Sequence, residues 1–238
     1  MGTSKGYLPP TGHLWTDTKR AVSSMVRNNS SSKAIGKAIS NFSKANGSNN
    51  SRNKGNSVIA TSGSKIMNFG NLVRSIGLNN ALDQVGLSHL KGKEAHAVFE
   101  GLLDYFSEGT NSLQQSIANQ AMQEYMEEIM GSVRDEEELE EVFVKLDTDV
   151  FIKDYITKYI EVSFFTNFAE KINSMCKDIG EAIRMQGRIR EFIRLEVSDS
   201  YKMDGLQNID WRGIEGRTYI ENKCEEVWGI FDMWSDLE

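Results

Sequence analysis

The sequence predicts an all-α fold, a helical bundle-like body that bears a flexible, basic N-terminal arm. Three observations lead to this prediction. Only two prolines occur among the 238 residues, Pro9 and Pro10, so the chain beyond them contains no proline to break a helix. Apolar residues recur at helical spacing along most of the sequence. Hydrophobic residues make up 39% of the chain and charged residues 26%, which allows a packed core.

The first fifteen residues have the composition of an extended tail. Glycines and prolines interrupt any regular helix there, and the residues that precede Pro9 and Pro10 are pushed towards extended backbone. Residues 1–15 are therefore predicted to form an N-terminal tail.

Residues 16–63 are predicted to form a basic arm that is rich in serine and asparagine. Thr16 or Asp17 can cap a short helix, and apolar spacing predicts a second helix near residues 33–45. The segment 46–57 has too few apolar residues to order itself, so we predict a disordered linker there.

Residues 64–238 are predicted to form an acidic, all-helical body. Helical periodicity marks a series of elements, at about 66–76, 78–85, 94–106, 113–130, 149–179, 181–197 and 218–234. The acidic run 135–141 favours the start of a further helix, because acids near a helix N-terminus interact well with the helix dipole. A metal site or a site for a basic partner is the less favoured interpretation of this run.

The charge of the chain is divided unevenly. Residues 1–74 contain eleven lysines and arginines and one acid, Asp17, which gives +10, whereas the whole chain has −7, so residues 75–238 have −17. A basic arm on an acidic body could bind nucleic acid, an acidic protein or the body itself. A solvated arm without a specific partner fits the charge equally well.

The residue types used in catalysis form no recognisable pattern. His13, His89 and His96 show no metal-binding or acid–base spacing, and no nucleotide-binding or hydrolase motif occurs. Cys176 and Cys224 have no Cys-x-x-Cys spacing and are interpreted as buried thiols. We therefore expect a protein that is not an enzyme and that has no metal or resident cofactor.

Two classes of segment that would direct the chain to a membrane are not recognised. No apolar run approaches the length of a membrane span, and the start of the chain lacks the apolar region of a secretory signal. We expect a cytoplasmic protein that does not bind membranes.

Gly2 is the residue whose chemistry is most informative. A small second residue permits removal of Met1, and the freed α-amine has a pKa of about 7.7–8.0, so a useful fraction is unprotonated in the cytoplasm. An unhindered amine on an extended tail is a good acceptor for acyl transfer, although every chain that starts Met-Gly shares this property. N-myristoylation is disfavoured, because Gly6 stands where that motif needs serine or threonine.

Two blocks of the sequence follow an order and spacing that are typical of a known family. The first is Gly2-Thr3-Ser4, followed by a stretch with proline and glycine up to Trp15. The second lies within roughly residues 60–130 and includes Leu87-Ser88-His89-Leu90-Lys91-Gly92, Val98-Phe99-Glu100-Gly101-Leu102-Leu103-Asp104 and Ser112-Leu113-Gln114-Gln115-Ser116-Ile117-Ala118. Together these blocks resemble QatB, of the QueC-associated (Qat) anti-phage systems.

This resemblance implies a non-catalytic component encoded beside an ATPase, a QueC-like enzyme and a TatD-like nuclease. QueC enzymes activate a deazapurine carboxylate with ATP and pass it to an amine. The implied role is a protein substrate that receives a deazaguanine through an amide at Gly2, with Thr3, Ser4 and Trp15 as the recognition tail. The resemblance implies no other cofactor than this covalent adduct.

The second hypothesis is a nucleic-acid-binding module that uses the basic N-terminal arm to neutralise phosphates. Such binding would weaken steeply with salt. Within residues 28–64, however, only Phe42 is available to stack on bases, and the basic residues are scattered. The defence-system component is therefore the leading hypothesis.

Overall fold

The fold is all-α, as predicted from the sequence. The computed structural model describes residues 11–28, 31–48, 50–107, 109, 111–204 and 209–234. Within these ranges there are ten α-helices, one 3-10 helix (η1) and no strand. The elements are α1 (His13–Arg27), α2 (Ser32–Ser48), α3 (Ser51–Ile76), α4 (Leu78–Gln84), η1 (Ser88–Leu90), α5 (Ala95–Phe106), α6 (Leu113–Met130), α7 (Glu136–Lys145), α8 (Thr148–Met175), α9 (Ile179–Ser200) and α10 (Ile214–Met233). None of the helices described is both long enough and apolar enough to cross a membrane.

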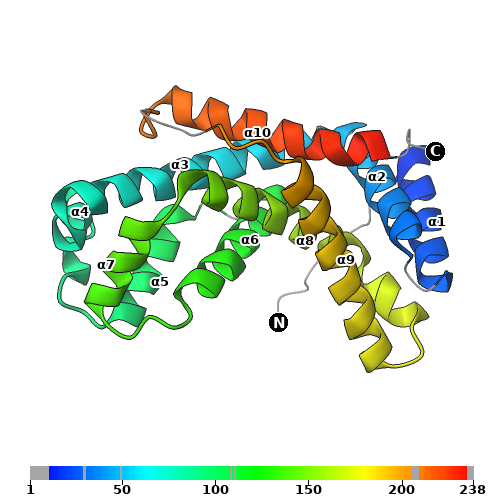
Figure 1. Cartoon of the computed structure of the whole chain (residues 1–238), viewed down its shortest axis with the longest axis horizontal. Coiled ribbons are helices and arrows are strands. Elements are labelled where there is room, and N and C mark those ends of the chain that lie inside the picture. The colour runs from blue at the N-terminus through cyan, green and yellow to red at the C-terminus, as the bar shows by residue number, and fades with distance from the viewer. Residues whose placement is uncertain are drawn as a thin grey trace.

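The helices are arranged along one long axis (Figure 1). The N-terminal helices α1 and α2 lie at one end, α4, α5 and α7 lie at the other, and α10 runs beside α3 between them. α3 and α8 form the centre of the fold, because every other α-helix packs against at least one of them. The first and last helices of the chain therefore share one core with the middle helices.

Local patterns explain the ends of several helices. Asp135 accepts a hydrogen bond from the backbone N–H of Glu138 at 2.9 Å, so the acidic run caps α7 and begins a helix as predicted. Ser112 caps α6 in the same way, at 3.2 Å from the N–H of Gln115. The predicted elements in the body correspond to the second half of α3 and to α4–α10, and η1 lies between the elements predicted at 78–85 and 94–106.

The prediction of a disordered linker at residues 46–57 is wrong. α2 continues to Ser48 and α3 begins at Ser51, and three polar residues of this stretch are buried: Asn46 is 7% exposed, Arg52 9% and Asn56 3%. Gly55 allows α8 to approach closely, because a β-carbon at this position would lie 1.9 Å from the hydroxyl oxygen of Tyr159. Polar partners and close backbone packing replace the apolar side chains that the composition lacks.

The described part of the basic arm is packed into the body. The expected boundary between residues 63 and 64 falls inside α3, which runs without a break. Phe42 of α2 is fully buried, and its ring centroid lies 6.0 Å from that of Trp15, 5.4 Å from that of Phe164 and 6.0 Å from that of Trp228. These rings come from α1, α8 and α10, so one aromatic cluster joins the arm to the body.

Candidate functional site

The base of the N-terminal tail lies at the start of α1. Gly2, Thr3 and Ser4 lie outside the described residues, which begin at Thr11. Gly12 has a φ of 119°, a backbone conformation that favours glycine, and its carbonyl accepts hydrogen bonds from the backbone N–H and the hydroxyl of Thr16, both at 3.0 Å. The chain thus turns at Gly12 and enters α1.

Trp15 fixes the first turn of α1 to the body. Its side chain is only 3% exposed, and its ring centroid lies 6.0 Å from that of Phe42 and 6.3 Å from that of Phe168. Its indole nitrogen, Nε1, has no hydrogen-bond partner among the residues that the structure describes. In this structure Trp15 therefore anchors the tail, and a role in recognising a partner would require it to leave the core.

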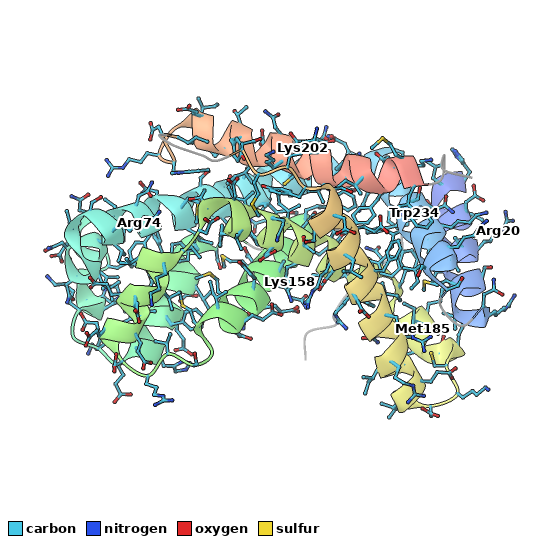
Figure 2. All side chains as sticks on the ribbon, in the orientation of Figure 1. Arg20, Arg74, Lys158, Met185, Lys202 and Trp234 are labelled. Atoms are coloured by element: carbon cyan, nitrogen blue, oxygen red, sulfur yellow. The ribbon has the colours of Figure 1, made fainter. Side chains whose placement is uncertain are left out.

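A basic surface covers the outer side of α1 and α2. These two helices contain six lysines and arginines and one acid, Asp17. A groove of about 460 Å³ runs between them and is lined by Asp17, Arg20, Ala21, Ser24, Ala34, Lys37 and Asn41. Arg20 lies at the outer edge of the molecule (Figure 2), and its side chain is 78% exposed. We call α1 and α2 with this groove the basic surface.

No local sequence pattern distinguishes Arg20 or Lys37 from the other basic residues of that surface. Both belong to the diffuse positive charge of the arm, and their proximity depends on how α1 packs against α2. The only local signal is the small size of Ala21 and Ala34, which leave space between the two helices.

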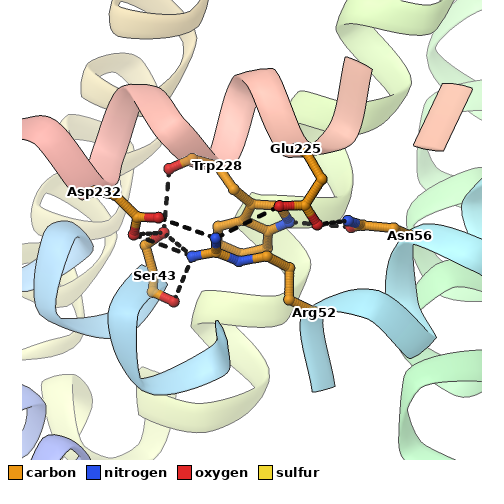
Figure 3. Close-up of polar contacts among 6 residues, drawn as sticks. All are labelled: Ser43, Arg52, Asn56, Glu225, Trp228 and Asp232. Carbon is orange, nitrogen blue, oxygen red and sulfur yellow. Dashed lines mark hydrogen bonds and ion pairs between the residues drawn. The ribbon is translucent and has the colours of Figure 1, made fainter. Parts of the chain in front are cut away.

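A polar cluster joins α2, α3 and α10, and we call it the Arg52 cluster (Figure 3). The guanidinium of Arg52 contacts both carboxylate oxygens of Asp232, at 2.9 and 3.0 Å, and donates to the carbonyl of Ser43 at 2.7 Å. Asn56 accepts a hydrogen bond from Trp228 Nε1 at 3.2 Å and donates to Glu225 at 2.5 Å. Because these groups mostly satisfy one another, we interpret the cluster as a junction between helices.

A second charged cluster lies between α6, α8 and α9, beside a cavity of about 250 Å³. Glu161 is only 1% exposed and accepts a hydrogen bond from Arg194 Nε at 2.9 Å. Burial raises the pKa of this carboxyl, while the positive charges of Arg194 and Lys158 oppose the increase. Lys158 also pairs with Glu128. Three acids and three bases line the cavity, so their charges cancel.

A third cluster surrounds Lys223 on α10, which is 2% exposed. Its ammonium lies 2.8 Å from a carboxylate oxygen of Asp204 and 2.9 Å from one of Glu226. Burial acts to lower the pKa of Lys223, but the hydrogen bonds to these two carboxylates outweigh burial and the pKa lies above its usual value. The cluster ties the segment before α10 to that helix.

The histidines and cysteines do not come together. His13, His89 and His96 are exposed and lie on α1, η1 and α5. Cys224 is fully buried, as predicted, and burial raises the pKa of its thiol; Cys176 is half-buried at the end of α8. Across the described ranges, no group of three or more His, Cys, Asp or Glu residues is arranged to hold a metal ion.

Comparison with known protein families gives a match over most of the chain. A family model described as "Qat anti-phage system associated protein QatB" matches residues 46–231 of this chain. The matched region begins near the end of α2 and includes nearly all of α10, whereas Gly2, Trp15 and the groove of the basic surface precede it. No curated protein and no solved structure matches the chain.

Proposed function

Because this chain belongs to the QatB family of Qat anti-phage system associated proteins, we propose that it serves its defence system as a protein substrate and an interaction scaffold, without catalytic activity of its own. The proposed acceptor is the α-amine of Gly2, and the proposed donor is a deazaguanine activated by a QueC-like partner. The further proposed partners are the ATPase and the TatD-like nuclease of the same system. The proposed location is the cytoplasm.

The proposed modification is an ordinary acyl transfer. The partner enzyme joins the deazapurine carboxylate to the AMP portion of ATP, which releases pyrophosphate. The neutral amine of Gly2 then attacks the activated carbonyl carbon, the new C–N amide bond forms, AMP leaves, and the amine loses a proton to water. The chain needs to supply only an unhindered amine that can enter the active site of the enzyme.

The main support for this proposal is that the tail with the Gly2 amine is attached to the folded body at a defined point. Trp15 is buried among the aromatic rings of α2 and α8, so the tail begins at a defined point on the body. Residues 2–10 are nine residues, which span at most about 30 Å when fully extended. That length is sufficient to place Gly2 inside a partner while the body remains folded outside.

The intact mass of the chain tests the proposal. We would express it with and without its neighbouring genes and compare the wild type with Gly2→Ala and with Gly6→Ala, which makes the same change elsewhere in the tail. We expect wild type and Gly6→Ala to gain the mass of the adduct, and Gly2→Ala to gain much less or none, because the added methyl crowds the attacking nitrogen. Substitutions of Thr3 or Ser4 should weaken modification less.

Circular dichroism and thermal melting serve as the control, since a change in the tail should leave the helical body intact. An unmodified Gly2 in an otherwise active defence system would overturn the proposal. The chain would then act as a scaffold only.

A nucleic-acid-binding module is the second candidate function, and the basic surface is the observation that favours it. Six bases and one acid on α1 and α2 would attract phosphates without sequence preference. Affinity for DNA or RNA should then fall steeply between 50 and 200 mM salt, by about tenfold or more if several phosphates are neutralised. Binding that is absent even at low salt would remove this candidate.

A further inference from the structure

We propose that the basic surface of α1 and α2 docks an acidic protein surface beside the active site of the enzyme that acylates Gly2. This inference rests on the proposed function and adds the location of the contact and the chemistry of the partner. It follows from the length of the tail, from the position of its base and from the charge around that base.

The short tail limits how far the enzyme can be from α1. The nine residues 2–10 span at most about 30 Å, and part of that length must lie within the active site of the enzyme. Thr11 must therefore come close to the mouth of that active site. Asp17 and Arg20 follow His13 by four and seven residues, which is about 6 and 10 Å along the helix axis. The basic surface thus lies next to the point where the enzyme must approach.

The charge of this surface selects an acidic partner. The exposed ion pair between Arg20 and Asp17, at 3.4 Å, is worth little, so the groove lined by Arg20, Lys37 and Asp17 remains positive. Lys37 is exposed on the other side of the groove, and Ala21 and Ala34 leave space between the two cations. A carboxylate that enters this space can form charge-assisted hydrogen bonds with Arg20.

The opposite end of the molecule would not repel such a partner. The acids of α7 and of the end of α6 lie away from α1 and α2 along the long axis (Figure 1). At physiological salt, interactions between exposed charges are largely screened beyond roughly 8 Å. An acidic partner at the basic surface would therefore be attracted locally, although the whole chain has a net charge of −7.

A protein fits this surface better than a single-stranded nucleic acid does. Such nucleic acids bind through bases stacked on exposed aromatic rings. The aromatic residues of α1 and α2 are Trp15 and Phe42, which are 3% and 0% exposed, so neither can stack on a base. The surface offers charge and a groove, which suit the carboxylates of a protein.

The test is a charge reversal on each side of the groove. We would measure the rate of adduct formation at Gly2 for Arg20→Glu/Lys37→Glu, using the full chain and the purified acylating enzyme. The matched control is Lys93→Glu/Arg217→Glu, which changes the net charge equally at two exposed bases away from α1 and α2. We expect kcat/KM to fall at least tenfold for the first variant at low salt and to stay within twofold of wild type for the control. The difference should shrink at high salt.

The outcomes separate this inference from the proposed function. Equal rates for the two double variants, with wild-type Gly2 fully modified, would overturn the docking surface and leave the modification intact. No adduct on the wild type would overturn both. A loss of DNA or RNA binding in Arg20→Glu/Lys37→Glu, with an unchanged rate of modification, would assign the surface to nucleic acid instead. Equal melting temperatures would show that a slow variant is still folded.

Discussion

Trp15 shows how the role of a single side chain can depend on residues that are distant in the sequence. Trp15 stands at the end of a proline- and glycine-containing stretch, and the resemblance to the QatB family implies that it belongs to a recognition tail. Its burial depends on Phe42 and Phe168, which are 27 and 153 residues away in the sequence. A local pattern contains no information about such partners, so the role of anchor could not be predicted from it.

The anchoring role of Trp15 leads to a prediction about two substitutions. Trp15→Ala should lower the free energy of unfolding by about 3–5 kcal/mol, because it leaves a cavity in the aromatic cluster. Trp15→Phe should cost about 1–2 kcal/mol, since a ring remains and the indole N–H makes no hydrogen bond within the described residues. Urea denaturation would measure both.

The same Trp15→Phe protein distinguishes an anchor from a recognition residue. If Trp15 is only an anchor, the folded Trp15→Phe variant should be modified at Gly2 at the wild-type rate. A large loss of modification with little loss of stability would instead show that the indole contacts the enzyme.

At the scale of secondary structure elements, the sequence predicted those helices whose apolar residues repeat within the helix itself. Helices with such an internal apolar repeat include α4, α5, α6 and α10. The start of α3 is different, because it is stabilised by polar partners that are distant in sequence. Arg52 binds Asp232, which is 180 residues away, and Asn56 binds Trp228, which is 172 residues away. Composition therefore indicated a linker where tertiary contacts form a helix.

Arg52 should be essential for ordering the junction between α2 and α3. Arg52→Met would remove the positive charge that pairs with Asp232 and the donor to the carbonyl of Ser43, so we expect a loss of about 2–4 kcal/mol in the free energy of unfolding. Arg52→Lys keeps the positive charge but loses the bidentate contact with Asp232, so the free energy of unfolding should fall by about 1–2 kcal/mol. Lys54→Met, an exposed change nearby, should stay within about 0.5 kcal/mol of wild type.

Limited proteolysis would show whether the junction is affected locally. Cleavage within residues 46–57 should be slow in the wild type and in Lys54→Met, and faster in Arg52→Met. Rapid cleavage of the wild-type protein at this junction would contradict the helical structure and support the linker that the composition suggested.

At the scale of the whole molecule, helix positions can be predicted more readily than helix pairing. α3 lies against α10, and α2 also contacts α10, although the segments are separated by most of the chain. No repeat or local motif indicates these pairs. The division of charge was visible in the sequence, but only the fold places α7, which contains the acidic run, at the end of the molecule opposite α1 and α2 (Figure 1).

Removal of the arm tests whether it belongs to the core. A chain of residues 64–238 lacks α1, α2 and half of α3, which would expose Phe164, Phe168 and Trp228 to water. We expect this fragment to lose its cooperative thermal transition, whereas residues 11–238 should retain the transition of the full chain. Calorimetry would measure both. A cooperative transition of the fragment near the wild-type melting temperature would support an independent body that begins at residue 64.

The contact between α2 and α10 also has a consequence for the timing of biosynthesis. Phe42 leaves the ribosome 186 residues before its neighbour Trp228, which at roughly 5–20 residues per second is an interval of roughly 10–40 s. If Met1 is removed early in that interval, the amine of Gly2 becomes available before the contacts of α1 and α2 with α8, α9 and α10 can form. A nascent or truncated chain would therefore present the amine without the completed surface beside it. Efficient conjugation would then select full-length protein, and the adduct would mark chains whose translation and folding are finished.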